Sequence, residues 1–207
     1  MSSNIIVISG PSGSGKSTLI RRLLQKYPEI VFSTSHTTRA KRVREIEGRD
    51  YYFIPKKQFL EMADNGEFVE WAQVYDNYYG TSYREIERKS RMSKKKYLVL
   101  DIDVQGAANI KKKYPDALFI FVVPPSMEEL RRRLVGREKT VDRQVRTRLE
   151  IAEDEMKQYH SYDYIIINEH LEKAFYILSS IFTAFKNSTS RLEPFIKRLL
   201  NKKKEYN

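Results

Sequence analysis

A glycine-rich stretch near the start of the chain permits few folds. Residues 10–17 read GPSGSGKS, with an apolar run (residues 4–9, NIIVIS) before them and a helical pattern (residues 16–27, KSTLIRRLLQKY) after them. In such a loop backbone N–H groups point at phosphate oxygens, Lys16 adds positive charge, and the helix adds its N-terminal dipole. The Ser17 hydroxyl is placed to ligate Mg²⁺. This context predicts a strand–loop–helix unit that binds a nucleoside triphosphate.

Further apolar runs alternate with helical patterns along the chain. Buried strands are expected over residues 97–103, 117–124 and 162–168, and helices over residues 105–113, 126–137, 141–158 and 169–185. Continuous apolar strands separated by helices are typical of a parallel sheet covered on both faces. The predicted fold class is therefore α/β, a P-loop NTPase core with a doubly wound parallel sheet.

Two stretches interrupt this alternation. Residues 33–90 are mixed, aromatic-rich and turn-rich, which indicates a small additional subdomain. Residues 136–148 include a break between two arginine-rich helical patterns, which favours a hinged lid. The core would then comprise residues 1–32, 91–135 and 149–187, and residues 188–207 would form a basic helical tail.

The composition of the 207 residues excludes several classes of protein. There is no cysteine, so disulfides and thiolate chemistry are excluded. No apolar run approaches the roughly 20 residues needed to span a bilayer, and the N-terminus does not resemble a signal peptide. We therefore expect a cytoplasmic protein without a membrane partner.

The net charge of +11 leaves more than one interpretation open. It permits a nucleic-acid surface or a site for small polyanions. Runs such as KSRMSKKK (residues 89–96) are more often solvated faces, so no nucleic-acid partner is expected.

A second group of anion-binding side chains follows the first helix, within STSHTTRAKR (residues 33–42). Arg39 and Arg42, with nearby Tyr51, could hold a single phosphate because guanidinium groups match phosphate oxygens. A solvated basic loop is the alternative. Farther along, LDIDVQG (residues 100–106) places two aspartates at the carboxyl end of an expected strand, where ligands of open α/β sheets bind.

Six motifs, in this order, resemble the guanylate kinase family. They are SGPSGSGKST (9–18), TTRAKR with GRDYYF (37–42 and 48–53), FVEWAQVYDNYYGT (68–81), LDIDVQG (100–106), FIFVVPPSMEELRRRLVGR (119–137) and YDYIIIN (162–168). The resemblance extends from the phosphate loop to about residue 185. It implies phosphoryl transfer from ATP to GMP or dGMP, with Mg²⁺ as cofactor.

The resemblance implies two nucleotide sites. The ATP site would comprise Gly10, Pro11, Ser12, Gly13, Ser14, Gly15, Lys16, Ser17, Thr18 and Asn168, with Ser17 as metal ligand. The GMP site would comprise Ser35, Arg39, Arg42, Tyr51, Glu70, Tyr79, Thr81, Asp101 and Asp103. In this site Glu70 accepts from guanine N1–H and N2–H₂, with Asp103 as second carboxylate, and Asp101 takes a polar or metal-linked role. For Trp71 the expectation is core packing.

The resemblance also implies a catalytic set in which cations act on the transferring phosphoryl group. Its members are Lys16, Arg133, Arg137 and Arg148. Arg133 and Arg137 lie four residues apart, hence on one helical face. The family commonly continues with Gly-Thr after Arg137, whereas Glu138 and Lys139 stand here.

Other functions compete with this one. The main alternative is a non-catalytic guanylate-kinase-like module that binds phosphorylated peptides. Another is a kinase for AMP, UMP or dTMP, against which the pair Glu70 and Asp103 argues. The sequence leaves the oligomeric state open.

Overall fold

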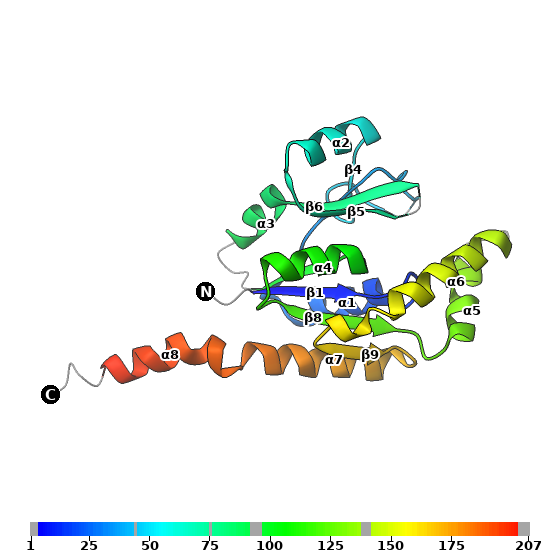
Figure 1. The fold of residues 1–207 in the computed structure, drawn as a ribbon. Coiled ribbons are helices and arrows are strands. Elements are labelled where there is room, and N and C mark those ends of the chain that lie inside the picture. The colour runs from blue at the N-terminus through cyan, green and yellow to red at the C-terminus, as the bar shows by residue number, and fades with distance from the viewer. Residues whose placement is uncertain (1–3, 44, 75, 92–96, 138–141, 203–207) are drawn as a thin grey trace.

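The computed structural model describes residues 4–43, 45–74, 76–91, 97–137 and 142–202, in which two β-sheets lie one above the other (Figure 1). The larger sheet is parallel throughout, in the order β2-β7-β1-β8-β9. Its strands are β1 (Ile5–Ser9), β2 (Ile30–Phe32), β7 (Tyr97–Asp101), β8 (Leu118–Val123) and β9 (Tyr164–Ile167). The predicted α/β class is confirmed, and the expected core strands are present with slightly shorter bounds.

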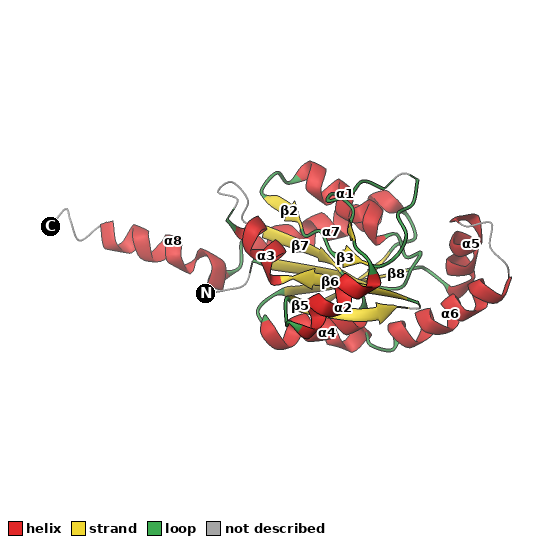
Figure 2. Cartoon of the chain, turned by 90° about the horizontal axis from the view of Figure 1, so that it is seen from above, coloured by secondary structure: helices red, strands yellow, loops and turns green. Residues whose placement is uncertain are grey.

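Helices cover both faces of this sheet, as Figures 1 and 2 show. On one face α1 (Lys16–Lys26) and α7 (Leu171–Lys186) bury side chains such as Leu23 and Phe182 against the strands. On the other face α4 (Val104–Lys113) buries Ala107 and Ile110. Every residue of the central strand β1 is buried because apolar helices lie on both sides of it.

Two further helices, α5 (Met127–Arg137) and α6 (Asp142–Met156), form a projecting pair at one end of the molecule (Figure 2). They pack against each other through Leu130, Leu134 and Val145. Within the predicted lid, residues 136–148, residues 138–141 lie outside the described part of the chain.

The smaller sheet has the order β4-β3-β6-β5 and lies above α4 in Figure 1. Val69 of β5 is buried in one cluster with Ala107 and Ile110 of α4, which packs the sheet onto the core. Its outer face is covered by Phe59, which stacks on Phe68 with ring centroids 4.5 Å apart. The elements are β3 (His36–Thr37), β4 (Tyr52–Phe53), α2 (Lys56–Asp64), β5 (Phe68–Val74), β6 (Asn77–Ser82) and α3 (Tyr83–Ser90).

The prediction for Trp71 is wrong, because this side chain is 41% exposed. It lies on β5, the edge strand of the smaller sheet. The covering helix α2 buries one residue, Phe59, which meets the indole edge-on with ring centroids 6.3 Å apart. Tyr78 lies beside it with ring centroids 6.1 Å apart, and no larger cover is built over this edge by the described residues, so part of the indole faces solvent.

The last described helix, α8 (Thr189–Lys202), extends away from the body of the protein (Figure 1). Arg191 holds its base: one guanidinium nitrogen donates to Asn4 Oδ1 at 2.6 Å, and the guanidinium carbon lies 3.6 Å from the centroid of the Phe185 ring. Residues 192–201 are all exposed. Among the helices of the described residues, none combines the length and apolarity needed to cross a membrane.

Candidate active site

The glycine-rich loop between β1 and α1 has the shape of an anion-binding cradle. Gly10 and Gly15 have φ of 138° and 95°. A Cβ at Gly10 would collide with Val122 O, and a Cβ at Gly15 would collide with Asn168 Nδ2. The N-cap residue of α1 is Gly15, which makes no side-chain cap hydrogen bond. The N-terminus of the helix can therefore bind an anion through its backbone N–H groups. Lys16 Nζ meanwhile donates to the carbonyl oxygens of the loop, at Gly10 and, at 3.3 Å, at Pro11.

Asn168 and Arg133 brace this loop from outside. Asn168 Nδ2 donates to Ser14 O at 2.7 Å, and Arg133 Nη2 donates to Asn168 O at 2.8 Å. The same guanidinium is held by Glu129 Oε1, 2.7 Å from its Nε. The predicted ATP-binding role of Asn168 and catalytic role of Arg133 stay predictions, and both residues lie against the loop.

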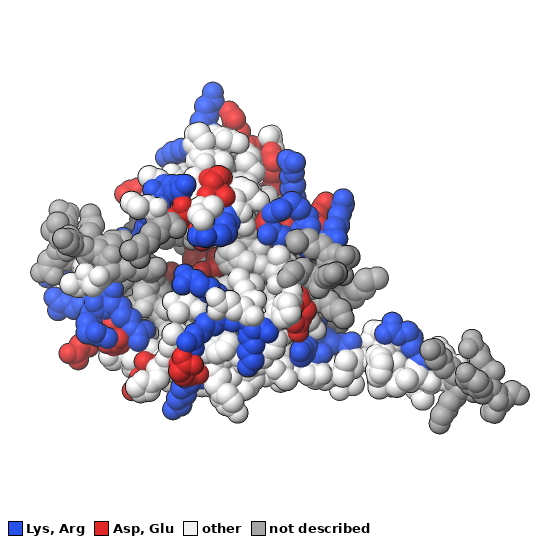
Figure 3. All heavy atoms as spheres, turned by 180° about the vertical axis from the view of Figure 1, so that it is seen from behind, with Lys and Arg blue, Asp and Glu red and all other residues white. Residues whose placement is uncertain are grey.

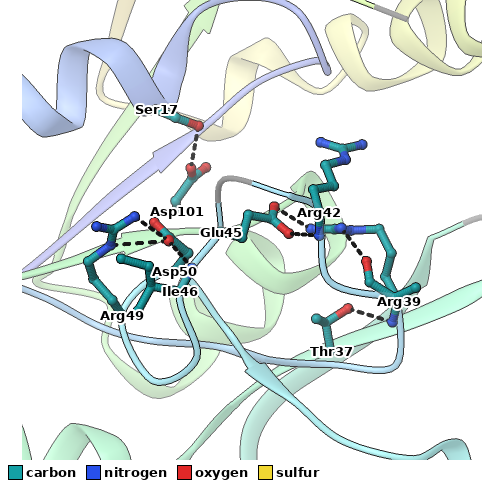
Figure 4. Close-up of polar contacts among 10 residues, drawn as sticks. Ser17, Thr37, Arg39, Arg42, Glu45, Ile46, Arg49, Asp50 and Asp101 are labelled. Atoms are coloured by element: carbon teal, nitrogen blue, oxygen red, sulfur yellow. Dashed lines mark hydrogen bonds and ion pairs between the residues drawn. The ribbon is translucent and has the colours of Figure 1, made fainter.

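A hydroxyl and a carboxylate meet beside the loop. Ser17 Oγ donates to Asp101 Oδ2 at 3.4 Å, across the carboxyl end of β7 (Figure 4). Mg²⁺ prefers oxygen ligands and usually takes one or two protein groups together with substrate phosphates. The oxygens of Ser17 and Asp101 fit that requirement, and the predicted polar or metal-linked role of Asp101 stays a prediction.

The guanidinium of Arg39 and the backbone of Arg42, in the predicted phosphate site, both contact a carboxylate that the sequence analysis did not single out. Glu45 Oε1 accepts from Arg39 Nη2 at 2.6 Å, and Glu45 Oε2 accepts from Arg42 N at 2.8 Å (Figure 4). Partial burial would raise the pKa of Glu45, but the hydrogen bonds from Arg39 and Arg42 outweigh it and lower the pKa. The available signal was an acidic residue three positions after Arg42, directly after the basic run of residues 39–44.

Two tyrosines complete this side of the site. The Arg39 guanidinium carbon lies 5.5 Å from the centroid of the Tyr51 ring, and the ring centroids of Tyr51 and Tyr79 are 6.0 Å apart. Burial raises the pKa of Tyr51, with the charge of Asp101 adding to the shift. Tyr51 therefore stays a protonated hydroxyl that can donate to an anion.

The predicted base-binding residues meet in a buried pocket. Glu70 is only 5% exposed, and Ser35 Oγ lies 3.2 Å from Thr81 Oγ1. Burial raises the pKa of Glu70 to about 7; Thr81 opposes this shift by hydrogen bonding and the charge of Asp103 reinforces it. Burial also raises the pKa of Asp103.

Gly106 makes the approach of the two carboxylates possible. Its backbone N–H donates to Asp103 Oδ1 at 2.7 Å, which also caps helix α4. A Cβ at Gly106 would lie 2.5 Å from Glu70 Oε2. The sequence analysis quoted Gly106 within a motif without seeing this role; a glycine in the first turn of a helix was the signal.

Glu155 on α6 is a further carboxyl that the sequence analysis missed. Burial raises its pKa to about 7, the charge of Lys16 opposes the shift, and the charge of Asp103 reinforces it. Nothing in the polar run AEDEM (residues 152–156) distinguishes it from a solvated glutamate.

The remaining predicted arginines lie on the projecting helices. Arg148 is half-buried on α6, and Arg137 is the last residue of α5, with its side chain outside the described part of the chain. Arg132, on the same helix as Arg133, pairs with Glu129 at the surface. Glu138 and Lys139 fall in the undescribed segment.

Seen from behind, the surface is hollowed between the smaller sheet and the core (Figure 3). Acidic side chains lie deep in this hollow, and lysine and arginine side chains lie around its rim. Such a charge pattern suits a nucleotide whose base, with its hydrogen-bond donors, enters the hollow and whose phosphate stays near the rim.

Comparisons with known proteins agree with this arrangement. The sequence model of the family described as guanylate kinase matches residues 2–185. The guanylate kinase of Geobacter metallireducens is 43% identical over 188 residues, covering 91% of this chain and 92% of that one. The guanylate kinase of Thermotoga maritima is 42% identical over 198 residues, covering 96% and 95%.

The fold comparison leads to the same family. The crystal structure of guanylate kinase from Anaplasma phagocytophilum superimposes with a TM-score of 0.74 at 37% identity, covering 92% of this chain and 90% of that one. With a phosphate loop, a second basic site and a buried carboxylate pocket in one chain, and with matches along nearly its whole length, this protein belongs to the guanylate kinase family.

Proposed function

We propose that this chain transfers the γ-phosphoryl group of ATP to GMP, giving ADP and GDP, and that dGMP is also accepted. Family membership and two separate anion sites support this activity. The loop at Lys16 would hold the ATP phosphates, and the cluster of Arg39, Arg42, Tyr51 and Tyr79 would hold the phosphate of the acceptor.

The observation that carries the choice of acceptor is the pair of the buried Glu70 and the partly buried Asp103. Guanine presents donors at N1–H and N2–H₂ beside an acceptor at O6. The ionised Glu70 can accept from both donors, while the hydroxyls of Ser35 and Thr81 lie close enough together to serve the O6 side. Adenine lacks those donors and would leave carboxylate oxygens without hydrogen-bond partners. The pocket should therefore discriminate strongly against adenine.

The transfer step needs positioning and charge neutralisation rather than covalent chemistry from the protein. Lys16 would leave the carbonyls of Gly10 and Pro11 for the phosphates of ATP. Arg133, Arg137 and Arg148 would neutralise charge on the transferring group. Ser17 and Asp101 would hold Mg²⁺, which when bound neutralises charge on the β- and γ-phosphates.

Closure of the site belongs to the same proposal. Residues 33–90 and the lid, residues 136–148, would move toward the core when both nucleotides bind, and this would exclude water from the transfer. Activity in the cytoplasm, without nucleic acid or membrane as partner, is the corresponding expectation. Small-angle scattering with a bisubstrate analogue tests the closure: unchanged dimensions would contradict it.

An ADP-release assay with ATP·Mg²⁺ and each nucleoside monophosphate in turn tests the function. We expect turnover with GMP and dGMP and none with AMP, UMP or dTMP. Turnover with another acceptor would overturn the assignment of the base pocket. Absence of turnover with every acceptor would overturn the enzyme and favour the phosphopeptide-binding module, which a phosphopeptide screen would then identify.

A further inference from the structure

The chain passes between the core sheet and the smaller sheet at two points, which we call crossings. At the first, Ser33 N donates to Val99 O of the core at 2.9 Å, while Ser35 O accepts from Tyr52 N of the smaller sheet, also at 2.9 Å. Thr34 is therefore the residue at which the chain passes from one sheet to the other. At the second crossing the chain leaves β6 directly into α3, which contacts both β6 and β7.

One buried carboxylate joins the two crossings. Glu85 lies in the first turn of α3 and is 3% exposed. Its Oε1 accepts from the Thr34 backbone N–H at 3.1 Å, and its Oε2 accepts from the Tyr52 hydroxyl at 3.3 Å. The contact with Thr34 joins residues 51 positions apart in the chain.

Helix capping does not account for this arrangement. In a capping box an acidic residue at this position reaches back to the backbone N–H of the N-cap residue. Here Ser82 caps the helix by accepting from Glu85 N at 3.2 Å, but the Glu85 carboxylate is turned to Thr34 and Tyr52 instead.

The charge of Glu85 is balanced by its own helix. Arg88 donates to both carboxylate oxygens, at 2.8 Å to Oε2 and 3.2 Å to Oε1, and Lys89 Nζ lies 3.6 Å from Oε1. A buried charge is tolerated only with partners of this kind, and losing one partner of such a set is costly. The contacts hold the acceptor at Thr34 in one place.

We infer that Glu85 is a positioning residue for the acceptor nucleotide, because it fixes the backbone next to two residues of the GMP site. Thr34 precedes Ser35, whose hydroxyl pairs with Thr81, and Tyr52 follows Tyr51 of the phosphate cluster. This inference rests on the proposed function. Without Glu85, the segment around Thr34 would become ordered only when GMP binds. GMP affinity would then fall, while the chemistry after binding would be unchanged.

The test is a split of kinetic constants in Glu85→Ala. We expect KM for GMP to rise about tenfold, because hydrogen bonds to a charged group are lost and the segment must be ordered on binding. The kcat and the KM for ATP should change by less than about twofold. Exchange of the Thr34 amide hydrogen, followed by NMR, should accelerate in the same variant.

Two matched variants make the result specific. Glu87→Ala removes a glutamate of the same helix whose side chain is 66% exposed and pairs only at 3.4 Å with Arg91, so all constants should stay at the wild-type values. Glu85→Gln keeps an oxygen that can accept from Thr34 N–H, so it should recover most of the GMP affinity.

Equal losses for GMP and ATP, a loss confined to kcat, or unchanged exchange at Thr34 would each overturn the inference. If Glu85→Ala does not fold, Tyr52→Phe removes one of the two bonds and should still raise KM for GMP by about twofold; no change would contradict the role. A wild-type enzyme that fails to phosphorylate GMP contradicts the proposed function, whereas the exchange experiment still decides whether Glu85 fixes Thr34.

Discussion

The phosphate loop and the proposed acceptor pocket present their binding groups by different means. The loop is eight consecutive residues, and backbone N–H groups and a helix end supply most of its binding capacity. The pocket instead uses side chains from four separate places, Ser35, Glu70, Thr81 and Asp103, brought together by the packing of the smaller sheet on α4. A local site depends on loop conformation, whereas an assembled site depends on how well its segments are held.

The largest expected effect comes from the loop. Lys16→Ala should lower kcat about a thousandfold, because the lysine charge on the transferring phosphates is lost. GMP binding, measured by calorimetry, should be retained because the acceptor pocket lies elsewhere. Lys26→Ala, in the last turn of the same helix, is the control and should leave turnover unchanged. Loss of GMP binding in Lys16→Ala would show that the two regions are not separable.

The second largest effect is expected from Gly106→Ala, which adds one methyl group beside the pocket. In Gly106→Ala the new Cβ would lie 2.5 Å from Glu70 Oε2, so the carboxylate must move. We expect KM for GMP to rise about a hundredfold with KM for ATP unchanged, as for loss of a charged hydrogen-bonding pair. Gln105→Ala, an exposed neighbour in the same turn, should behave as wild type. Parallel losses for both substrates would contradict a local effect.

The charge of Glu70 makes the pocket sensitive to pH in a way the loop is not. Its pKa is raised to about 7, so the carboxyl gains a proton as pH falls below 7. GMP affinity should fall up to about tenfold per pH unit there, because a protonated carboxyl cannot accept from both guanine donors. In Glu70→Gln the GMP affinity should be low and should not change with pH around 7; a wild-type profile in that variant would assign the titration to another group.

The same shift has a consequence for stability with a defined sign. Between the unfolded pKa of 4.5 and the folded value of about 7, the folded state binds more protons than the unfolded state at Glu70. Its contribution to the free energy of unfolding therefore decreases as pH rises through this window. Glu70→Gln should reduce that pH dependence, which denaturant unfolding at pH 5 and pH 8 would measure.

The smallest effect is expected at Glu45, which holds Arg39 and the Arg42 backbone in place. Glu45→Ala should raise KM for GMP by about fivefold, because the arginine loses its fixed orientation but keeps its charge. Glu61→Ala, an exposed glutamate of α2, is the matched control. An improved KM in Glu45→Ala would show instead that this carboxylate competes with the phosphate of GMP.

The sequence alone was sufficient for the local parts of this protein. The order of apolar strand, GPSGSGKS and helix specifies the loop, because glycine conformations and helix dipoles act over a few residues. The alternation of apolar runs and helical patterns predicted the parallel sheet, because strands covered by helices on both faces are apolar along their length. The six motifs indicated the family and supplied the candidate residues of the pocket, although not their contacts.

Only the tertiary structure decided which distant groups meet. The contact of Glu85 with Thr34, the clearance at Gly106 for Glu70 and the exposure of Trp71 all depend on elements far apart in the chain. Periodicity shows which face of an element is apolar, but not how much of that face its partner covers, as Trp71 shows. Nor does the chain mark which of many glutamates becomes buried, because burial and its cost are set by packing between segments.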